Sequence, residues 1–285
     1  FAGIDSIDAS ERIRRPRFLD ACVQTVYQGR ISLLQLWRCH VALLITMPRS
    51  RPKVFAIIPA AGAGVRLGGS VKKQFLPLQG KPVIVHTLRQ FEFCPEVDEV
   101  CVAVPESAIV EMEALVSQYR LHKVSKVLVG GEKRQDSVSR VLSRLPLKDS
   151  DIVLVHDGVR PFVQPKKISQ LIKACKAHEA AVLAVQPKDT IRRSNGGGFF
   201  DQTLDRSALW LIQTPQAFKA SLLRRAFEKA KKDKFYSTDE AALVERLGVK
   251  VKIVEGSYDN IKITTQEDLD LGSLILERWK SRVHL

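Results

Sequence analysis

Small residues and cations gather in one stretch, VFAIIPAAGAGVRLGGSVKKQF, which spans residues 54–75. An apolar run leads into Pro59, alanines and glycines follow it, and Arg66, Lys72 and Lys73 come next. Backbone N–H groups without bulky side chains can closely approach a triphosphate, and neighbouring cations can neutralise its charge. The stretch therefore predicts a loop that binds phosphate groups.

The glycine spacing of this loop fits neither of the two best-known phosphate-binding patterns. A dinucleotide-binding loop reads G-x-G-x-x-G; Gly62 and Gly64 fit it, but Leu67 occupies the third position. A P-loop reads G-x-x-x-x-G-K-[ST]; Gly64 and Gly69 fit it, but Ser70 stands in place of the lysine. A dinucleotide-binding oxidoreductase is thus an alternative that lacks its third glycine.

Polar residues also follow later apolar runs, in the segments GGEKRQDSV (130–138), HDGVRP (156–161), KDT (188–190), TPQ (214–216) and EGSYDNIKIT (255–264). They offer glycines, hydroxyls, cations such as Lys262, and one carboxylate, Asp157, directly after an apolar run. Nucleotidyl and phosphoryl transfer need neutralised charge and in-line positioning, which cations and Mg²⁺ supply. The set favours an enzyme of this kind over a non-catalytic binding protein, with Asp157 binding a metal or a hydroxyl.

Strand-like and helix-like patterns alternate from Lys53 onward. Short β-branched runs predict strands at 54–58, 99–104, 126–129, 152–155, 181–185, 209–213 and 250–254. Helical periodicity predicts helices at 81–93, 107–119, 134–145, 165–178, 220–231, 238–247 and 265–279. This alternation predicts an α/β fold with a doubly wound, mostly parallel Rossmann-like sheet, in which ligands bind beyond the carboxyl ends of the strands.

One segment breaks the alternation. Residues 188–207 contain two polar strand-like runs around Ser-Asn-Gly-Gly-Gly, which predicts a protruding β-hairpin arm. Because an isolated hairpin is marginally stable in water, we expect the arm to dock on something, for example a second subunit.

Several of these segments together resemble a known family. PAAGAGVRL with KKQF, VGGEKRQDSV, VLVHDGVRPF, DRSALWLIQTPQAF, STDEAALVE and EGSYDNIKIT follow, in order, the motifs of the 2-C-methyl-D-erythritol 4-phosphate cytidylyltransferases of the non-mevalonate isoprenoid pathway. The resemblance covers about residues 53–282. It implies transfer of a cytidylyl group from CTP to methylerythritol phosphate with release of pyrophosphate. Since the first motif marks only the wider nucleotidyltransferase superfamily, an enzyme acting on another sugar or polyol phosphate is the alternative.

The resemblance also implies roles for individual residues. The catalytic cations are Arg66, Lys73 and Lys262. The nucleotide-binding residues are Pro59, Ala60, Ala61, Gly62, Gly130, Gly131 and Ser137. The acceptor-binding residues are Asp157, Arg160, Thr190, Arg206 and Thr214; Asp157 also serves as a Mg²⁺ ligand together with the CTP phosphates. The hairpin carrying Thr190 and Arg206 reaches across the interface of a homodimer. Lys72 replaces a frequent proline of the family, but Lys73 matches the catalytic lysine by position.

The first residues differ from the rest of the chain. No lysine precedes Lys53, and patterned sequence begins only after Met47. We expect residues 1–46 to be an extension outside the functional domain; one interpretation is translation from upstream of a start at Met47. The cytidylyltransferase domain is expected at 47–285, and since only 23 residues of this sequence follow Lys262, we expect it without the cyclase domain fused to some relatives.

Composition narrows the partners and the compartment. The net charge of +14 is dispersed, with no run of five basic residues, which argues against nucleic-acid binding. The apolar run at 31–47 is shorter than the roughly 20 residues of a membrane span and contains Arg38 and His40. Five cysteines without CxxC spacing favour a reducing compartment. We therefore expect a cytoplasmic enzyme in a bacterium, or a plastid enzyme in a photosynthetic eukaryote, with no membrane contact.

Overall fold

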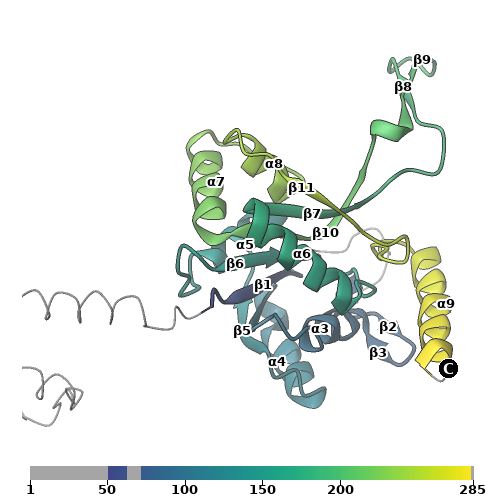
Figure 1. Ribbon diagram of the computed structural model, residues 1–285. Coiled ribbons are helices and arrows are strands. Elements are labelled where there is room, and N and C mark those ends of the chain that lie inside the picture. The colour runs from purple at the N-terminus through teal and green to yellow at the C-terminus, as the bar shows by residue number, and fades with distance from the viewer. Residues whose placement is uncertain (1–50, 63–71, 284–285) are drawn as a thin grey trace, which may run out of the picture. The chain divides into compact units, whose positions relative to one another are not determined.

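A seven-stranded sheet forms the centre of the fold, as seen in the computed structural model, which describes residues 51–62 and 72–283 (Figure 1). The predicted extension at 1–46 and the predicted catalytic Arg66 lie outside the described residues. In spatial order the strands are β11 (Lys252–Glu255), β7 (Ala180–Val185), β10 (Leu211–Lys219), β6 (Ile152–Val155), β1 (Val54–Pro59), β4 (Glu99–Val104) and β5 (Val124–Val129). All seven predicted strands are present in this sheet.

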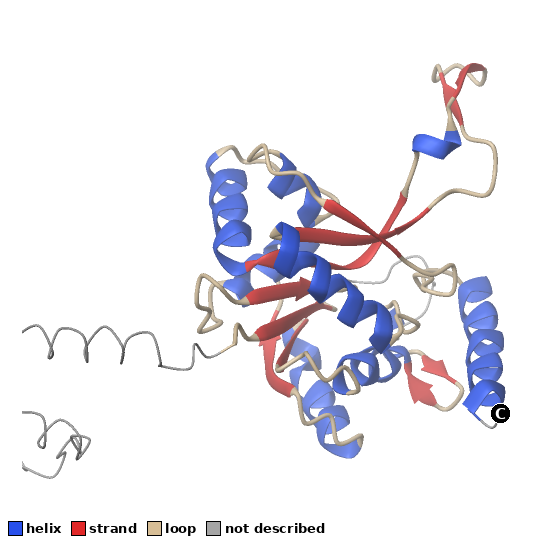
Figure 2. Ribbon diagram, viewed as in Figure 1, coloured by secondary structure: helices blue, strands red, loops and turns tan. Residues whose placement is uncertain are grey.

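Helices cover both faces of the sheet, which confirms the doubly wound fold (Figure 2). Strand β1 shows why: Val54, Ala56 and Ile58 are buried in one apolar cluster, while Phe55 and Ile57 are buried in the other. Alternating side chains of a strand point to opposite faces, so a strand that is apolar throughout needs cover on both. One face is covered by α3 (Val83–Glu92), α4 (Ile109–Gln118) and α6 (Pro165–His178), the other by α5 (Arg134–Leu142), α7 (Ala220–Lys232) and α8 (Glu240–Glu245).

Strand β10 corrects one part of the prediction. It runs antiparallel to both neighbours, β6 and β7, whereas the other strand pairs of the sheet are parallel. It begins two residues later than the predicted strand and continues to Lys219, so Thr214 lies inside the strand and not beyond its end. The pairing with β7 is irregular between Ile212 and Gln216, and this irregularity places Thr214 beside the carboxyl end of β6.

The predicted hairpin arm is present between β7 and β10. Its strands, β8 (Arg192–Ser194) and β9 (Phe200–Thr203), pair with each other and with no strand of the main sheet, and every residue in them is exposed. A short 3-10 turn, η4 (Arg206–Ala208), follows. The arm projects away from the sheet, as the ribbon shows (Figure 1).

The remaining described elements surround the sheet. A 3-10 turn, η2 (Lys73–Phe75), leads into the small pair β2 (Pro77–Leu78) and β3 (Lys81–Pro82), and η3 (Glu106–Ala108) precedes α4. The last helix, α9 (Gln266–Val283), contributes Leu269 and Ile275 to a third apolar cluster with Leu78 and Phe162. None of the helices in the described part of the chain is long and apolar enough to span a membrane.

Candidate active site

A pocket of about 170 Å³ opens beyond the carboxyl end of β1. The lining includes the small-residue run Pro59–Gly62 and, after the loop, Lys73 and Gln74. The remaining lining residues are Gly131, Glu132, Lys133, Arg134, Ser137, Asp157, Val159 and Lys262. A strand that ends in small residues thus places its N–H groups at a site rimmed by cations, as a phosphate-binding loop requires.

The glycines after β5 allow two loops to approach closely. A side chain on Gly130 would place its Cβ 2.4 Å from the Cβ of Ala61, and one on Gly131 would meet Asp136 Cβ at 2.3 Å. Ser137 fixes the turn, because its Oγ accepts from the Gly131 N–H at 2.9 Å. Gly130 therefore lies behind the pocket wall rather than in it, while Gly131 and Ser137 line the pocket.

Neighbouring side chains distinguish the two adjacent lysines. Lys73 lines the pocket, and the buried Gln74 donates to the carbonyl oxygen of Ala60 at 2.6 Å, which ties η2 to the end of β1. Lys72 donates instead to Ser107 Oγ at 3.0 Å and is not among the lining residues. The geometry favours Lys73 as the lysine that meets a ligand in this pocket.

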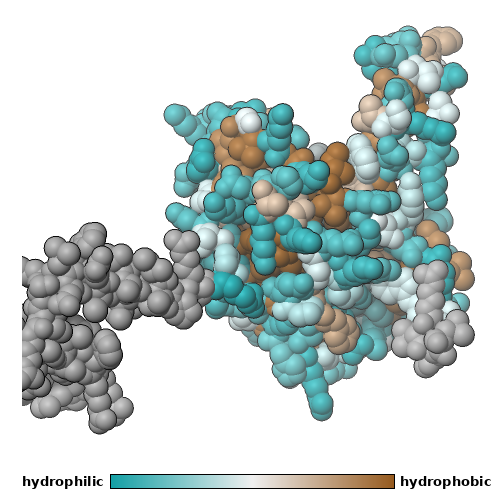
Figure 3. Space-filling view, in the orientation of Figure 1, coloured by the Kyte–Doolittle hydropathy of each residue, from teal (hydrophilic) through white to brown (hydrophobic). Residues whose placement is uncertain are grey.

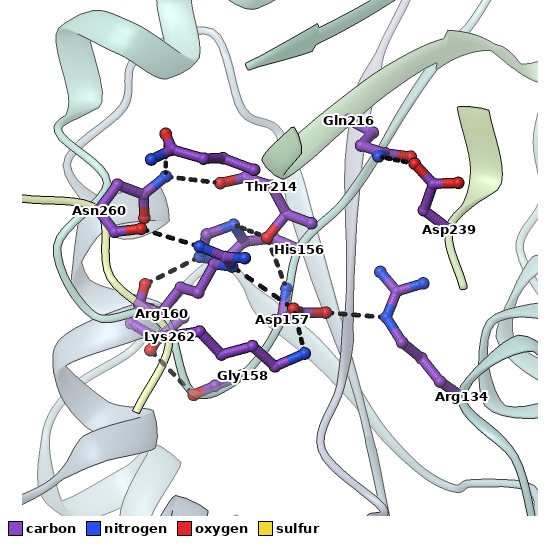
Figure 4. A network of polar contacts seen from close by, with 12 residues as sticks. Arg134, His156, Asp157, Gly158, Arg160, Thr214, Gln216, Asp239, Asn260 and Lys262 are labelled. Atoms are coloured by element: carbon purple, nitrogen blue, oxygen red, sulfur yellow. Dashed lines mark hydrogen bonds and ion pairs between the residues drawn. The ribbon is translucent and has the colours of Figure 1, made fainter. Parts of the chain in front are cut away.

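Asp157 lies at the centre of a cluster of cations just after β6 (Figure 4). Its Oδ1 accepts from Arg134 Nε at 2.8 Å, and its Oδ2 lies 3.0 Å from Lys262 Nζ and 3.5 Å from Arg160 Nε. Burial alone would raise the pKa of this carboxyl, but the three cations outweigh burial and hold the pKa well below its usual range. Asp157 is therefore an anion at any physiological pH.

Arg134 is a site residue that the sequence analysis did not single out. Its Nη1 donates to both oxygens of Glu240, at 2.7 and 2.8 Å, while its Nε holds Asp157. Burial raises the pKa of Glu240, although Arg134 acts in the opposite direction. Arg134 and Glu240 are 106 residues apart, and sequence spacing gives no sign that they meet. The one available signal was that Arg134 belongs to the GGEKRQDSV segment at a strand end.

A second pocket, of about 490 Å³, adjoins the first. The two share Arg134, Asp157 and Lys262 in their linings. The second pocket is further lined by Arg160 and Thr214, both predicted acceptor-binding residues, and by Gln213, Gln216, Thr238 and Asp239. Two ligands in these pockets would meet at the shared residues.

Thr214 is held firmly beside Asp157. Its Oγ accepts from the Asp157 N–H at 3.1 Å and lies 3.0 Å from His156 Nδ1. A carbonyl oxygen can only accept, so His156 Nε2 carries a proton and donates to the carbonyl oxygen of Arg160 at 3.0 Å. In the neutral ring Nδ1 then has no proton and accepts from the Thr214 hydroxyl. Burial lowers the pKa of His156 to about 4, in agreement with this tautomer.

Thr190 and Arg206 are not brought to either pocket of this chain. Both are exposed and lie in the arm, and neither is among the lining residues of the two pockets. Arg206 donates to the carbonyl oxygen of Lys188, a contact within the base of the arm. The predicted acceptor-binding residues are thus divided between the edge of the sheet and the arm.

Asp157 is the carboxylate that the two pockets share, while Glu132 lines the first pocket and Asp239 and Glu245 line the second. Among the described residues, no group of three or more His, Cys, Asp or Glu side chains could hold a metal ion by itself. Mg²⁺ is commonly bound by one or two carboxylates together with substrate phosphates. Asp157 fits that arrangement, because Oδ1 accepts from Arg134 Nε and an ionised carboxylate oxygen has a further lone pair for a cation.

A doubly wound sheet with a small-residue loop, converging cations and two joined pockets at its carboxyl edge defines a nucleotidyltransferase-like protein. The chain belongs to the 2-C-methyl-D-erythritol 4-phosphate cytidylyltransferase family, whose model matches residues 54–278. It is 44% identical over 234 residues to the enzyme of that name from Syntrophus aciditrophicus, which covers 82% of this chain and all of the relative. It is 46% identical over 221 residues to the enzyme from Geobacillus kaustophilus, covering 78% and 96%.

Solved structures of cytidylyltransferases of this family are also similar to this chain. The 4-diphosphocytidyl-2C-methyl-D-erythritol synthase from Anaerococcus prevotii is similar, with a TM-score of 0.70 and 31% identity over 79% of this chain and 96% of that one. The 2-C-methyl-D-erythritol 4-phosphate cytidylyltransferase from Thermus thermophilus has a TM-score of 0.65 and 33% identity, covering 78% and 98%. The expected family and fold class are therefore confirmed.

Proposed function

We propose that this chain transfers the cytidylyl group of CTP to 2-C-methyl-D-erythritol 4-phosphate, releasing pyrophosphate and forming 4-diphosphocytidyl-2-C-methyl-D-erythritol. The observation that carries the proposal is the pair of pockets sharing Arg134, Asp157 and Lys262. A nucleotide in one pocket and a phosphorylated acceptor in the other would bring their reacting atoms to the same cations. Family membership supports CTP and 2-C-methyl-D-erythritol 4-phosphate as these two substrates.

CTP occupies the first pocket in this proposal. Pro59 has no N–H and the N–H of Ala60 donates to the Ala103 carbonyl oxygen, so the N–H groups of Ala61 and Gly62 are the ones that approach the triphosphate. The turn at Gly131 lies beside them without a side chain to hinder the nucleoside. Ser137 contributes to selection of the nucleoside, and Lys73, which also lines the pocket, neutralises the triphosphate. We assign Arg66 to the same task from the family resemblance.

The acceptor occupies the second pocket, where its phosphate meets Arg160 and Thr214. An oxygen of that phosphate attacks the α-phosphorus of CTP in line. The new O–P bond forms as the bond from the α-phosphorus to the bridging oxygen breaks, and pyrophosphate leaves with that electron pair. No protein base is required, because the attacking phosphate is already anionic near neutral pH.

Charge neutralisation then accounts for the catalysis. Lys262 Nζ lies at the boundary of the two pockets, 3.0 Å from Asp157, where it can stabilise charge developing on the α-phosphate. A divalent cation such as Mg²⁺, held by the CTP phosphates and Asp157, would neutralise triphosphate charge when bound. Asp157 in turn keeps Lys262 and Arg160 oriented before the substrates arrive.

A homodimer would complete the acceptor site. Thr190 and Arg206 are exposed in the arm of their own chain, and Phe199 and Phe200 near its tip are 74% and 68% exposed. Hydrophobic residues on the arm are visible among polar ones in the space-filling view (Figure 3). Docking the arm on a second copy would bury these phenylalanines and bring Thr190 and Arg206 to the partner's acceptor pocket.

A reducing, cytoplasmic location remains part of the proposal. Cys94, Cys101 and Cys175 are buried and unpaired, and burial raises the pKa of all three thiols. Such thiols behave as apolar core residues and form no stabilising cross-link. The fold described here therefore has no need of an oxidising compartment.

A pyrophosphate-release assay tests the proposed reaction. The purified full chain is incubated with CTP, Mg²⁺ and methylerythritol phosphate, and the organic product is identified by mass spectrometry. Stoichiometric pyrophosphate and the cytidine-diphosphate-linked product support the proposal. Turnover with another sugar or polyol phosphate but not with methylerythritol phosphate would show that the enzyme uses a different acceptor. No turnover with any acceptor would refute the proposed reaction.

A further inference from the structure

Arg134 joins two buried carboxylates at the boundary of the nucleotide and acceptor pockets. It contacts Asp157 through Nε and Glu240 through Nη1, with all three distances between 2.7 and 2.8 Å. Glu240 is 1% exposed and Asp157 6% exposed. A planar guanidinium can hold two carboxylates at a fixed angle, whereas a lysine ammonium is a single point charge on a flexible stem.

The Glu240 end of this bridge is anchored to the sheet. Gln216 in β10 donates to Asp239 Oδ2 at 2.8 Å and accepts from the Ala241 N–H at 3.0 Å. These two bonds flank Glu240 at the start of α8 and tie it to the strand that also carries Thr214. Glu240 therefore has a fixed place, and through Arg134 it fixes the carboxylate of Asp157.

The three cations around Asp157 differ in what else holds them. Lys262 forms an ion pair with Asp157, while Arg160 also donates to the Asn260 carbonyl oxygen at 2.9 Å. Arg134 alone among the three has a second carboxylate. When anionic phosphates enter the pockets, they compete with Asp157 for its cations. Arg134 is the contact that Asp157 keeps, because Glu240 holds the guanidinium in place.

A role in stability alone does not account for Arg134. Arg134 lines both pockets, and its Nη2 is buried without a hydrogen-bond partner among the described residues. An unsatisfied buried donor is unfavourable. A side chain present only to neutralise Glu240 would not need to lie at the boundary of two ligand pockets with one of its donors unsatisfied.

We propose that Arg134, anchored by Glu240, is a positioning residue that keeps Asp157 at the pocket boundary while Lys262 transfers from Asp157 to the reacting phosphate. This inference rests on the proposed function and deepens it. It assigns Arg134 and Glu240 to the transfer step rather than to the binding of either substrate alone. The expected signature is a loss in kcat with little change in the KM for CTP.

The first test is Arg134→Lys, which keeps the positive charge but cannot bridge two carboxylates rigidly. We expect kcat to fall on the order of 10²-fold, as for other losses of preorganised charge in an active site. The KM for CTP should stay within about two-fold, since Pro59–Gly62 and Lys73 are unchanged. The matched control is Arg224→Lys on α7, where the arginine contacts Asp149 and the Leu147 carbonyl oxygen at the surface. Its kcat should equal that of the wild type.

A second variant, Glu240→Gln, removes the anchoring charge while keeping the size and one acceptor. It should lower kcat by about ten-fold, less than Arg134→Lys, because Arg134 still reaches Asp157. Circular dichroism melting of each variant separates this effect from unfolding. If Arg134→Lys lost activity only in proportion to the fraction unfolded, a purely structural role would be established and the inference overturned.

A double-mutant cycle with Asp157→Asn measures the coupling between Arg134 and Asp157. If Arg134 acts through Asp157, then Arg134→Lys should reduce kcat by only about two-fold in the Asp157→Asn background. Equal losses in both backgrounds would overturn the inference, because they would mean that Arg134 acts independently of Asp157. The wild-type assay distinguishes the two proposals. An inactive wild type refutes the proposed function together with this inference, whereas an active wild type with an additive cycle refutes the inference alone.

Discussion

The edge of the sheet and the hairpin arm carry the two halves of the proposed acceptor site, and they are held in different ways. At the edge, Asp157 and Thr214 are each 6% exposed, and Arg134, Arg160 and His156 fix them from several elements. In the arm, Thr190 and Arg206 are exposed, and β8 and β9 pair only with each other.

The edge of the sheet is therefore preorganised within one chain, whereas in the proposed homodimer the arm depends on assembly of two chains. The residues at the edge already have their polar partners within one chain, so their geometry is determined by folding. The residues of the arm have no described contact with either pocket and would reach an acceptor only after a second chain binds. Changes at the edge should therefore affect turnover and stability, whereas changes in the arm should affect acceptor affinity and association.

The largest effect is expected for Lys262→Ala. Removing the cation at the boundary of the pockets should lower kcat on the order of 10²–10³-fold, and Lys73→Ala should have a comparable effect through the triphosphate. Steady-state kinetics measure both. Lys219→Ala is a matched control, since Lys219 lies on the surface and pairs with Glu179 at 2.8 Å. Near-normal turnover of Lys262→Ala would remove Lys262 from the mechanism.

The next effect is a pH dependence of stability, caused by the buried imidazole of His156 at the edge of the sheet. Burial lowers the pKa of His156 from 6.5 to about 4. As the pH falls from about 6.5 to 4, the unfolded chain therefore binds a proton that the folded chain does not, and the folded state loses about 3 kcal/mol of stability. Urea unfolding at a series of pH values measures this slope. His156→Gln should lack this part of the slope, and identical slopes would contradict the assignment.

A smaller effect is expected for Arg206→Ala in the arm. The KM for the acceptor should rise about ten-fold, with the KM for CTP unchanged, because one charge-assisted contact to the acceptor phosphate is lost. Mixing this variant with Lys262→Ala tests whether the arm acts on the other subunit. With the acceptor well below its KM, each variant alone is slow, but in a mixed dimer one of the two sites has both residues intact. An equal mixture should therefore regain about a quarter of the wild-type activity under these conditions. No recovery would show that the arm does not act across subunits.

The smallest effect is expected for the apolar residues of the arm. Phe200→Ser should weaken the dimer about five-fold, as for a residue near the rim of an interface, without changing the fold of the subunit. Analytical ultracentrifugation over a range of concentrations measures the dissociation constant. The matched change Phe93→Ser removes another exposed phenylalanine, 66% exposed after α3, and should leave association unchanged. Equal effects of both changes would argue against an interface formed by the arm.

Much of the fold could be predicted because strands and their ends leave local signals. The run VFAIIP is apolar on both faces and is followed by small residues, so both the buried strand and the loop after it were predictable from one segment. The same logic placed Asp157 after β6 and Lys262 after β11, and these two side chains do meet. The antiparallel direction of β10 had no such signal, since a buried strand reads the same in either direction.

The Arg134–Glu240 ion pair was not predictable, for a related reason. Each residue begins a helix, and each taken alone resembles a charged residue in a first helical turn. Their meeting depends on α5 and α8 covering the same face of the sheet. Periodicity indicates that each helix has an apolar side, but it does not indicate which two helix starts become neighbours.

The way in which the arm leaves the sheet has a consequence for how this protein could be redesigned. The arm departs after β7 and returns at β10, and these strands are direct neighbours in which Val185 pairs with Leu211 (Figure 2). Its two ends are therefore already side by side, and a short turn could replace everything between them without re-pairing any strand. The arm is in this sense a separable module: the sheet can keep its pairing when the arm is shortened, so removal of the arm would test the proposed roles of Thr190 and Arg206 without disturbing the pockets at the edge of the sheet.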